Sequence, residues 1–176
     1  GLHNRQDWTA QMTDATPDWI ALELAPRRAR AWAMSAQGDV LDSLTTDLPG
    51  AGQEIDMPTH WHPERCPVLA TGPVPGPVAV QPVPAKPSDL TPRPTPSDTF
   101  PTLLALPGLS QSAPPDLMQT GATRLAAILG VHPQFDGVVL LPGETSHWAH
   151  ISAEEVVSFQ SFATGELFAA LTGTPN

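Results

Sequence analysis

Hydrophobic and polar residues alternate in three short stretches near the start of the chain. We expect strands at 19–24, 30–36 and 40–46, because successive side chains of a strand point to opposite faces of its sheet. The Gln37-Gly38-Asp39 segment has the composition of a hairpin turn and joins the second strand to the third. This region therefore predicts three consecutive antiparallel strands.

A second patterned stretch runs from 136 to 171. It predicts strands at 138–141, 147–151 and 156–162, followed by a helix at 166–171. The first of these strands is a continuous apolar run, which is typical of a strand buried on both faces, and Pro142-Gly143 ends it. Thr164 is the expected N-cap of the helix, and Glu166 lies in its first turn.

Between these stretches, helical periodicity appears at 116–129. Asp116 is the expected cap, and the apolar side is formed by Leu117, Gly121, Leu125, Ile128 and Leu129. Short strands are expected at 68–70 and 102–106. The latter ends in Leu106-Pro107-Gly108, which echoes Leu141-Pro142-Gly143. We therefore expect two parallel strands that end alike and are joined through the helix in a right-handed connection.

Proline is concentrated in the middle of the chain, where 17 of the 22 prolines lie between 49 and 115. Proline lacks a backbone N–H, so this tract predicts loop, edge strand or polyproline II conformation. We interpret 49–101 as a long surface crossover, and a ligand for a proline-binding domain is the alternative. The expected organisation is a flexible leader at 1–17 and a single lobe at 18–176.

Composition narrows the classes of function. The chain has 18 acidic and 8 basic residues, a net charge of −10, which argues against nucleic-acid binding or an anionic membrane surface. Lys86 is the only lysine, so no Gly-Lys-Ser/Thr phosphate loop exists. Cys66 is the only cysteine, which excludes an intrachain disulfide and favours a reducing, cytoplasmic location. No apolar run is long enough for a membrane span.

Two further kinds of site were weighed. His60-Trp61-His62, with Glu64 and Cys66 nearby, has residue types that ligate metals, but no second pair with zinc-like spacing follows. We therefore assign no metal to these residues and interpret the segment as a loop. No Gly-x-Ser-x-Gly pattern occurs, so a serine hydrolase is not supported.

From about Trp19 to Leu171 the chain resembles the N-terminal lobe of the 2-dehydro-3-deoxygalactonokinase family. The matching pieces, in order, are IALELAPRRARAWAMSAQGDVL, LLALPGL, the helix after Asp116, VVLLPGETSHW and FQSFATGELFAAL. The resemblance implies an α/β fold with a mixed sheet, a ribonuclease-H-like lobe of the actin and hexokinase kind. It also implies ATP and Mg²⁺ as cofactors, with the γ-phosphate transferred to 2-dehydro-3-deoxygalactonate.

The resemblance also implies roles for individual residues. Phosphoryl transfer requires positioned carboxylates and charge around the phosphates, which makes Glu23 and Glu166 the candidate catalytic residues. The expected phosphate- or nucleotide-binding residues are Arg28, Arg30, Gly143 and Glu144. The expected substrate-binding residues are Gly72, Trp148, Thr164 and Gly165.

The chain departs from the family pattern at the motifs that serve the nucleotide. Where the family has a glycine-rich turn after a carboxylate, this chain has Glu23 followed by Leu-Ala-Pro-Arg-Arg. The Arg-Gly-Glu-Glu pattern that opens the family's helix is replaced by Gln119-Thr120-Gly121-Ala122, and this sequence ends where the resemblance leads us to expect the family's second lobe to begin. We therefore expect impaired kinase activity, with a non-catalytic lobe for binding or assembly as the alternative. The expected partners are a sugar acid and either a second copy of the chain or a second lobe.

Overall fold

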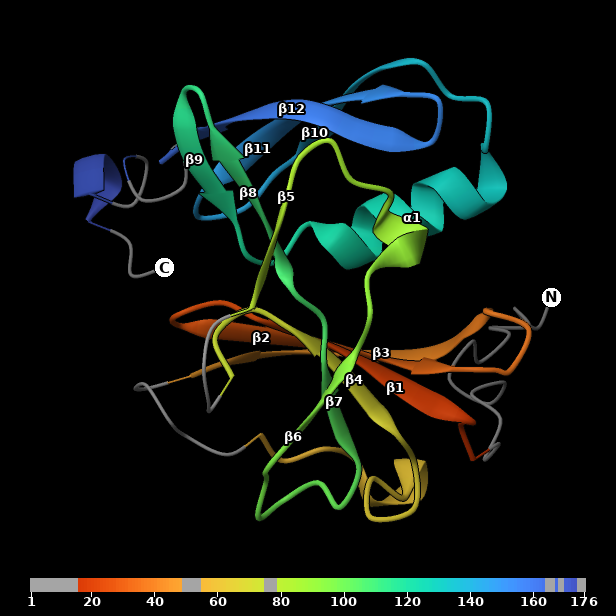
Figure 1. Cartoon of the computed structure of the whole chain (residues 1–176). Coiled ribbons are helices and arrows are strands. Elements are labelled where there is room, and N and C mark those ends of the chain that lie inside the picture. Colours follow the sequence, from red (N-terminus) through yellow and green to blue (C-terminus); the bar gives the residue numbers. More distant parts are fainter. Residues whose placement is uncertain (1–15, 49–54, 75–78, 164–166, 168–169, 174–176) are drawn as a thin grey trace, which may run out of the picture.

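The computed structural model describes residues 16–48, 55–74, 79–163, 167 and 170–173. A mixed six-stranded sheet forms one end of the molecule, and two three-stranded sheets with one helix form the other (Figure 1). The six-stranded sheet has the order β3-β2-β1-β4-β7-β6 and consists of β1 (Trp19–Leu24), β2 (Arg28–Met34), β3 (Val40–Asp47), β4 (Val68–Thr71), β6 (Arg93–Thr95) and β7 (Leu103–Ala105).

The second end contains the remaining elements. One sheet has the order β5-β8-β9, from β5 (Val80–Pro82), β8 (Gly108–Ser112) and β9 (Pro115–Met118). The other has the order β10-β11-β12, from β10 (Gly137–Leu141), β11 (Ser146–Ser152) and β12 (Glu155–Phe162). Helix α1 (Ala122–Val131) packs on the β10–β12 sheet, and single 3₁₀ turns occur at η2 (Thr59–Trp61) and η3 (Pro87–Asp89). No helix of the described residues is long and apolar enough to cross a membrane.

The strands expected from alternation are confirmed. The three N-terminal ones are β1, β2 and β3, paired antiparallel in sequence order, and β11 and β12 match the C-terminal ones. β1 is also parallel to β4, and β4 is parallel to β7, so the sheet is mixed. The expected leader lies mostly outside the described residues, which begin at 16, and so does the start of the C-terminal helix.

The prediction of a helix at 116–129 is wrong at its beginning. Asp116 and Leu117 lie in β9, which pairs antiparallel with β8, and α1 begins at Ala122 with no side-chain cap. Leu117 is 40% exposed whereas Met118 is fully buried, so these positions follow the two-residue period of a strand. These residues form a strand because they pair with β8. The helical spacing of apolar residues carries no information about such a pairing.

The expected parallel pair joined through the helix is also wrong. β7 belongs to the six-stranded sheet, whereas β10 pairs antiparallel with β11, and α1 joins β9 to β10. After Leu106 the chain does not turn back but continues into β8, where Gly108 is paired with Val80 of β5. The two Leu-Pro-Gly sequences therefore end strands in different sheets.

The expectation that β10 is buried on both faces is wrong as well. Val138 is 57% exposed and Leu140 is 47% exposed, while Leu141 is buried against α1. The β10–β12 sheet is thus covered on one face by α1 and open on the other. In the proline-rich tract, β5 and β6 both lie at sheet edges, where a missing backbone donor costs least.

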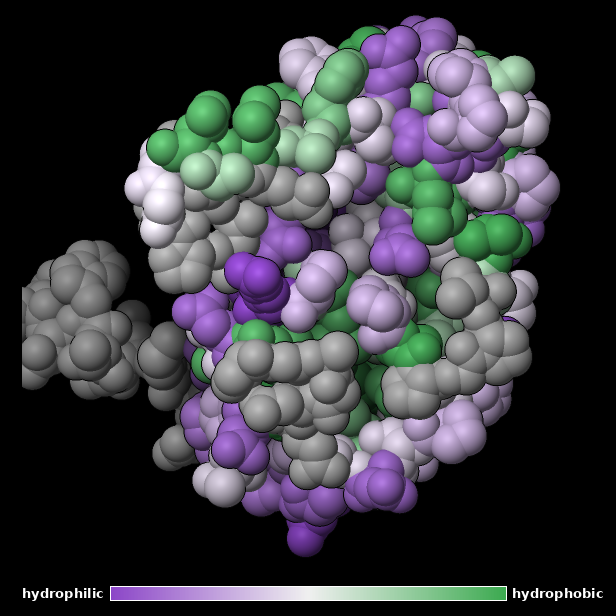
Figure 2. Space-filling model, turned by 90° about the vertical axis from the view of Figure 1, so that its left-hand side faces the viewer, coloured by the Kyte–Doolittle hydropathy of each residue, from purple (hydrophilic) through white to green (hydrophobic). Residues whose placement is uncertain are grey.

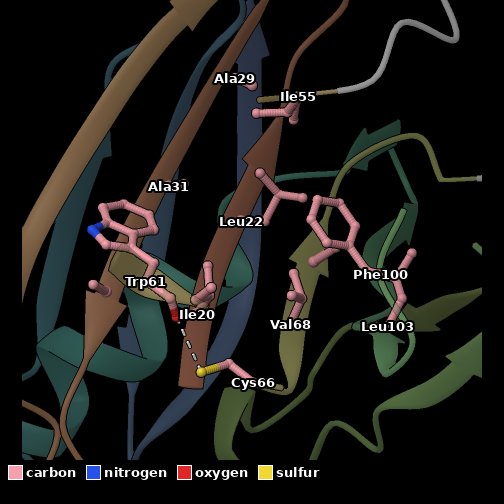
Figure 3. Close-up of a cluster of buried hydrophobic side chains, with 12 residues drawn as sticks. Ile20, Leu22, Ala29, Ala31, Ile55, Trp61, Cys66, Val68, Phe100 and Leu103 are labelled. Carbon is pink, nitrogen blue, oxygen red and sulfur yellow. Dashed lines mark hydrogen bonds between the residues drawn. The ribbon is translucent and has the colours of Figure 1, made fainter. Parts of the chain in front are cut away.

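The six-stranded sheet buries one of two apolar clusters, shown in Figure 3. Ile20 and Leu22 of β1 meet Val68 of β4, and Trp61 and Phe100 close the cluster from loops. Trp61 is only 1% exposed, and its indole Nε1 donates a hydrogen bond to Asp42 Oδ2 at 2.9 Å. Burial and hydrogen bonding together hold η2 against β3.

Replacing Trp61 by phenylalanine is expected to lower the free energy of unfolding by about 2 kcal/mol, since both the hydrogen bond to Asp42 and part of the core volume are lost. Trp19→Phe is the control, because its Nε1 bonds to Ser35 O from a half-buried position and should cost about half as much. Urea titration followed by circular dichroism measures both. An unchanged midpoint for Trp61→Phe would contradict its place in the core.

Candidate functional site

Glu23 is a buried carboxylate at the carboxyl end of β1, only 8% exposed. Sheet register places it beside Arg30 of β2 on one side and Thr71 of β4 on the other. Thr71 is fully buried. Carboxyl ends of parallel strands are common places for ligand sites in mixed sheets, because loops diverge there. The strand pairing thus gathers polar side chains at this one edge.

Arg124 of α1 completes this cluster. Its Nε lies 3.2 Å from Glu23 Oε2, and its NH1 donates a hydrogen bond to the carbonyl of Pro142 at 3.1 Å. The guanidinium therefore connects the six-stranded sheet to the turn that follows β10. The Nε–Oε2 contact has ion-pair distance but not hydrogen-bond alignment, so Glu23 Oε2, Arg124 Nε and Thr71 Oγ1 are buried without a hydrogen-bond partner among the described residues.

The charge state of Glu23 reflects opposing effects. Burial raises its pKa above the ordinary value, because the carboxylate loses hydration, and the guanidinium groups of Arg124 and Arg30 offset only part of this. One carboxylate therefore faces two permanent cations. This balance favours a polar or anionic neighbour over a further cation.

A cleft of about 270 Å³ begins at Leu24, the residue after Glu23, although Glu23, Thr71 and Arg124 do not line it. Three segments form it: the end of β1 with its turn, the segment between β9 and α1, and the turn between β10 and β11. The lining residues are Leu24, Ala25, Pro26, Leu117, Gln119, Thr120, Glu144, Thr145 and His147. The lining combines apolar side chains with amide, hydroxyl, carboxylate and imidazole groups. Such a lining suits a small hydroxylated ligand.

His147 is the one buried histidine of the described residues, 5% exposed, and sequence reasoning assigned it no role. Its Nδ1 lies 2.6 Å from Ser161 Oγ of β12. Burial lowers the pKa of His147, and although Asp116 raises it, Arg124 lowers it further. Burial therefore favours the neutral form of the ring, which can donate or accept a hydrogen bond. The signal was present in the alternation, which places His147 on the inner face of β11 with Ala149 and Ile151.

The structure brings together only part of the residues expected at the site. Glu23 and Arg30 are neighbours, and Glu144 lines the cleft next to Gly143. Arg28 instead lies on the surface, where its Nε is 3.4 Å from Asp47 Oδ1.

The remaining predicted residues lie apart. Gly72 borders a separate hollow of about 90 Å³, and Trp148 is 47% exposed on the outer face of β11. Thr164, Gly165 and Glu166 lie outside the described residues.

A magnesium ion does not fit Glu23 as this site stands. Its carboxylate is paired with Arg124 and adjoins Arg30, so a divalent cation would meet two like charges. In the part of the chain that the structure describes, no group of three His, Cys, Asp or Glu side chains could hold a metal. No step of a reaction is therefore assigned to a metal at this carboxylate.

We first compared the fold with solved protein structures. It is similar to the crystal structure of a provisionally assigned 2-dehydro-3-deoxygalactonokinase from Sinorhizobium meliloti, with a TM-score of 0.66 and 20% sequence identity. The alignment covers 88% of this chain and 56% of that protein, so this chain spans little more than half the length of the solved relative. The fold is thus similar to part of the fold of that protein.

The sequence comparison identifies the family. The 2-keto-3-deoxy-galactonokinase family matches residues 27–175, and the chain belongs to this family. None of the curated proteins compared with the chain matches it. The family inferred from the residues is thereby confirmed.

Proposed function

We propose that this chain is the acceptor-binding lobe of a sugar-acid kinase that phosphorylates 2-dehydro-3-deoxygalactonate. The family match over 27–175 carries this proposal. We infer a ribonuclease-H-like lobe, because three antiparallel strands followed by two parallel ones give the order β3-β2-β1-β4-β7. A cytoplasmic location stays a prediction.

The cleft beside Glu23 is the proposed acceptor site. Its volume of about 270 Å³ suits a six-carbon acid, and its polar side chains offer complementary partners for hydroxyl groups. The Glu144 carboxylate would accept a hydrogen bond from a sugar hydroxyl, and the neutral His147 ring would donate or accept another. Ser161 holds that ring by its Nδ1 and fixes its orientation. These residues would bind and orient the acceptor.

The proposal that this chain also binds ATP has weaker support from the structure. Ala25 N already donates to Arg28 O, and Pro26 has no N–H, so this turn offers few backbone donors to a phosphate. Arg27 and Arg30 would supply positive charge only. ATP would supply the transferred phosphoryl group when bound, and the residues of this turn would hold only part of it. We therefore propose that phosphoryl transfer by the chain alone is impaired.

Isothermal titration tests the proposal directly. The chain is expected to bind 2-dehydro-3-deoxygalactonate saturably without ATP, and Glu144→Gln should weaken that binding about tenfold by removing a charged acceptor. Glu154→Gln is the matched control, because Glu154 is exposed in the turn between β11 and β12 and away from the cleft. Absence of sugar-acid binding at millimolar concentration would sink the acceptor-site proposal.

A non-catalytic lobe used for binding or assembly is the second candidate. The pairing of Glu23 with Arg124 supports it, because this arrangement occupies a carboxylate that a kinase would direct to its metal. A coupled assay for ADP release with ATP, magnesium and the sugar acid separates the two. Any turnover that depends on Glu144 would exclude the non-catalytic alternative.

A further inference from the structure

The outer face of the β10–β12 sheet is hydrophobic and open. Val138 and Leu140 of β10 are 57% and 47% exposed, and Trp148 of β11 and Phe162 of β12 are exposed to a similar degree. Sheet register pairs Leu140 with Trp148, so these side chains adjoin across neighbouring strands of one face. Hydrophobic side chains are visible at this end of the molecule in Figure 2. We call this surface the outer sheet face.

The outer sheet face differs from scattered surface hydrophobics. It forms a hollow of about 1060 Å³, lined by Val138, Trp148, His150, Ser158, Phe159, Gln160, Phe162, Ala163 and Leu167. None of these described residues is Asp, Glu, Lys or Arg, and His150 is the one titratable side chain among them, although the chain as a whole carries a charge of −10. A contiguous apolar surface of this kind marks an interaction site. The described residues of the outer sheet face offer no Asp, Glu, Lys or Arg side chain with which a charged partner could form an ion pair.

The sequence gives independent support for a covered face. The continuous apolar run at 138–141 is typical of a strand buried on both sides, yet the isolated chain buries only one side. α1 and the buried cluster around it account for Leu141 and Ala149. Val138 and Leu140 do not belong to that cluster and remain half-exposed, and Leu167 lines the same hollow as Val138. A second layer of protein packed on the outer sheet face would bury β10 on both sides, as its apolar sequence predicts.

We propose that the outer sheet face packs against the same face of a second copy of the chain, about a twofold axis. A twofold contact requires one surface that is complementary to itself, and an uncharged apolar sheet meets this condition. Two chains of charge −10 repel one another, so contact is most favourable where no acidic side chain faces its copy. Two sheets packed face to face, about 10 Å apart, would bury these strands on both sides. This inference goes beyond the proposed function and does not depend on kinase activity.

The size of the outer sheet face sets the affinity that we expect for the proposed dimer. Nine described residues line the hollow, and Leu140 adjoins them through its pairing with Trp148, whereas a standard interface has about 20–30 residues on each side. We therefore expect a reversible dimer with a dissociation constant in the micromolar range.

Sedimentation velocity between about 1 and 300 µM is the test. The unmodified chain is expected to shift from monomer to dimer over this range, and Leu140→Glu, which places two carboxylates in the contact, should remain monomeric throughout. Val131→Glu is the matched control, because Val131 is 74% exposed at the end of α1, away from the face, and should dimerise like the unmodified chain. Val138→Glu gives a second disruption if Leu140→Glu does not fold by circular dichroism.

Two outcomes would overturn the proposal. A chain that stays monomeric to 300 µM would leave the outer sheet face to a different partner. A dimer that persists equally in Leu140→Glu and Val138→Glu would place the contact elsewhere on the surface.

Discussion

Replacing Gly72 by alanine is expected to destabilise the fold by about 2–5 kcal/mol, the largest effect expected from adding one methyl group at any described glycine. Gly72 has a φ of +96°, and an added Cβ would lie 2.0 Å from the carbonyl oxygen of Leu24. A backbone atom cannot move aside as a flexible side chain can, so the ends of β1 and β4 must separate. Because Glu23 and Thr71 precede these positions, the polar cluster would be displaced as well.

Gly38→Ala separates the two causes of this effect. Gly38 has nearly the same φ, +90°, but an added Cβ would meet nothing within 4 Å. Its substitution should therefore cost only the conformational strain of about 1–2 kcal/mol. Urea titration of both variants gives the difference, which reports the close approach of Gly72 to Leu24. Equal losses in the two variants would show that close packing contributes nothing at Gly72.

Replacing Arg124 by methionine is expected to lower the free energy of unfolding by about 2–4 kcal/mol at pH 7. The change leaves the buried Glu23 carboxylate without the cation that lies 3.2 Å away, and it also removes the hydrogen bond to Pro142 O. The effect is smaller than for a fully enclosed pair, since the Arg124 side chain is 24% exposed. Arg65→Met is the control, because Arg65 forms an exposed ion pair with Glu64 and should change stability by less than about 1 kcal/mol.

The pH dependence of this variant identifies the buried charge as the cause. The pKa of Glu23 is raised by burial, so the folded state holds its proton to a higher pH than the unfolded state. Its contribution to stability is therefore present at low pH and lost as pH rises from the unfolded value of 4.5 through the folded pKa. Arg124→Met should raise that pKa further and steepen the loss toward neutral pH. Adding Glu23→Gln should remove most of this slope, and a slope that persists would assign it to another group.

Local sequence pattern was sufficient for much of the fold. Alternation located β1, β3, β11 and β12, because which residues of a half-buried strand face the core is set by the two-residue period alone. The FATGELFAAL segment and its companions identified the family, which the match over 27–175 confirms. Glu23 was predicted as a site residue from the resemblance, because it keeps the carboxylate of the family's first hairpin.

Contacts between distant segments decided the rest, because residues far apart in sequence leave no local periodicity. Pairing of β8 with β9 converted the expected start of the helix at Asp116 and Leu117 into a strand. The sequence did not indicate that Arg124 belongs to the site. Its guanidinium group lies between Glu23 and Pro142 only because of how α1 packs in the fold. The sequence by itself thus determined most of the strands and the family. Only the tertiary structure decided which sheet each strand joined, which charges met at Glu23, and that the outer sheet face remains open, since these depend on the packing of whole elements.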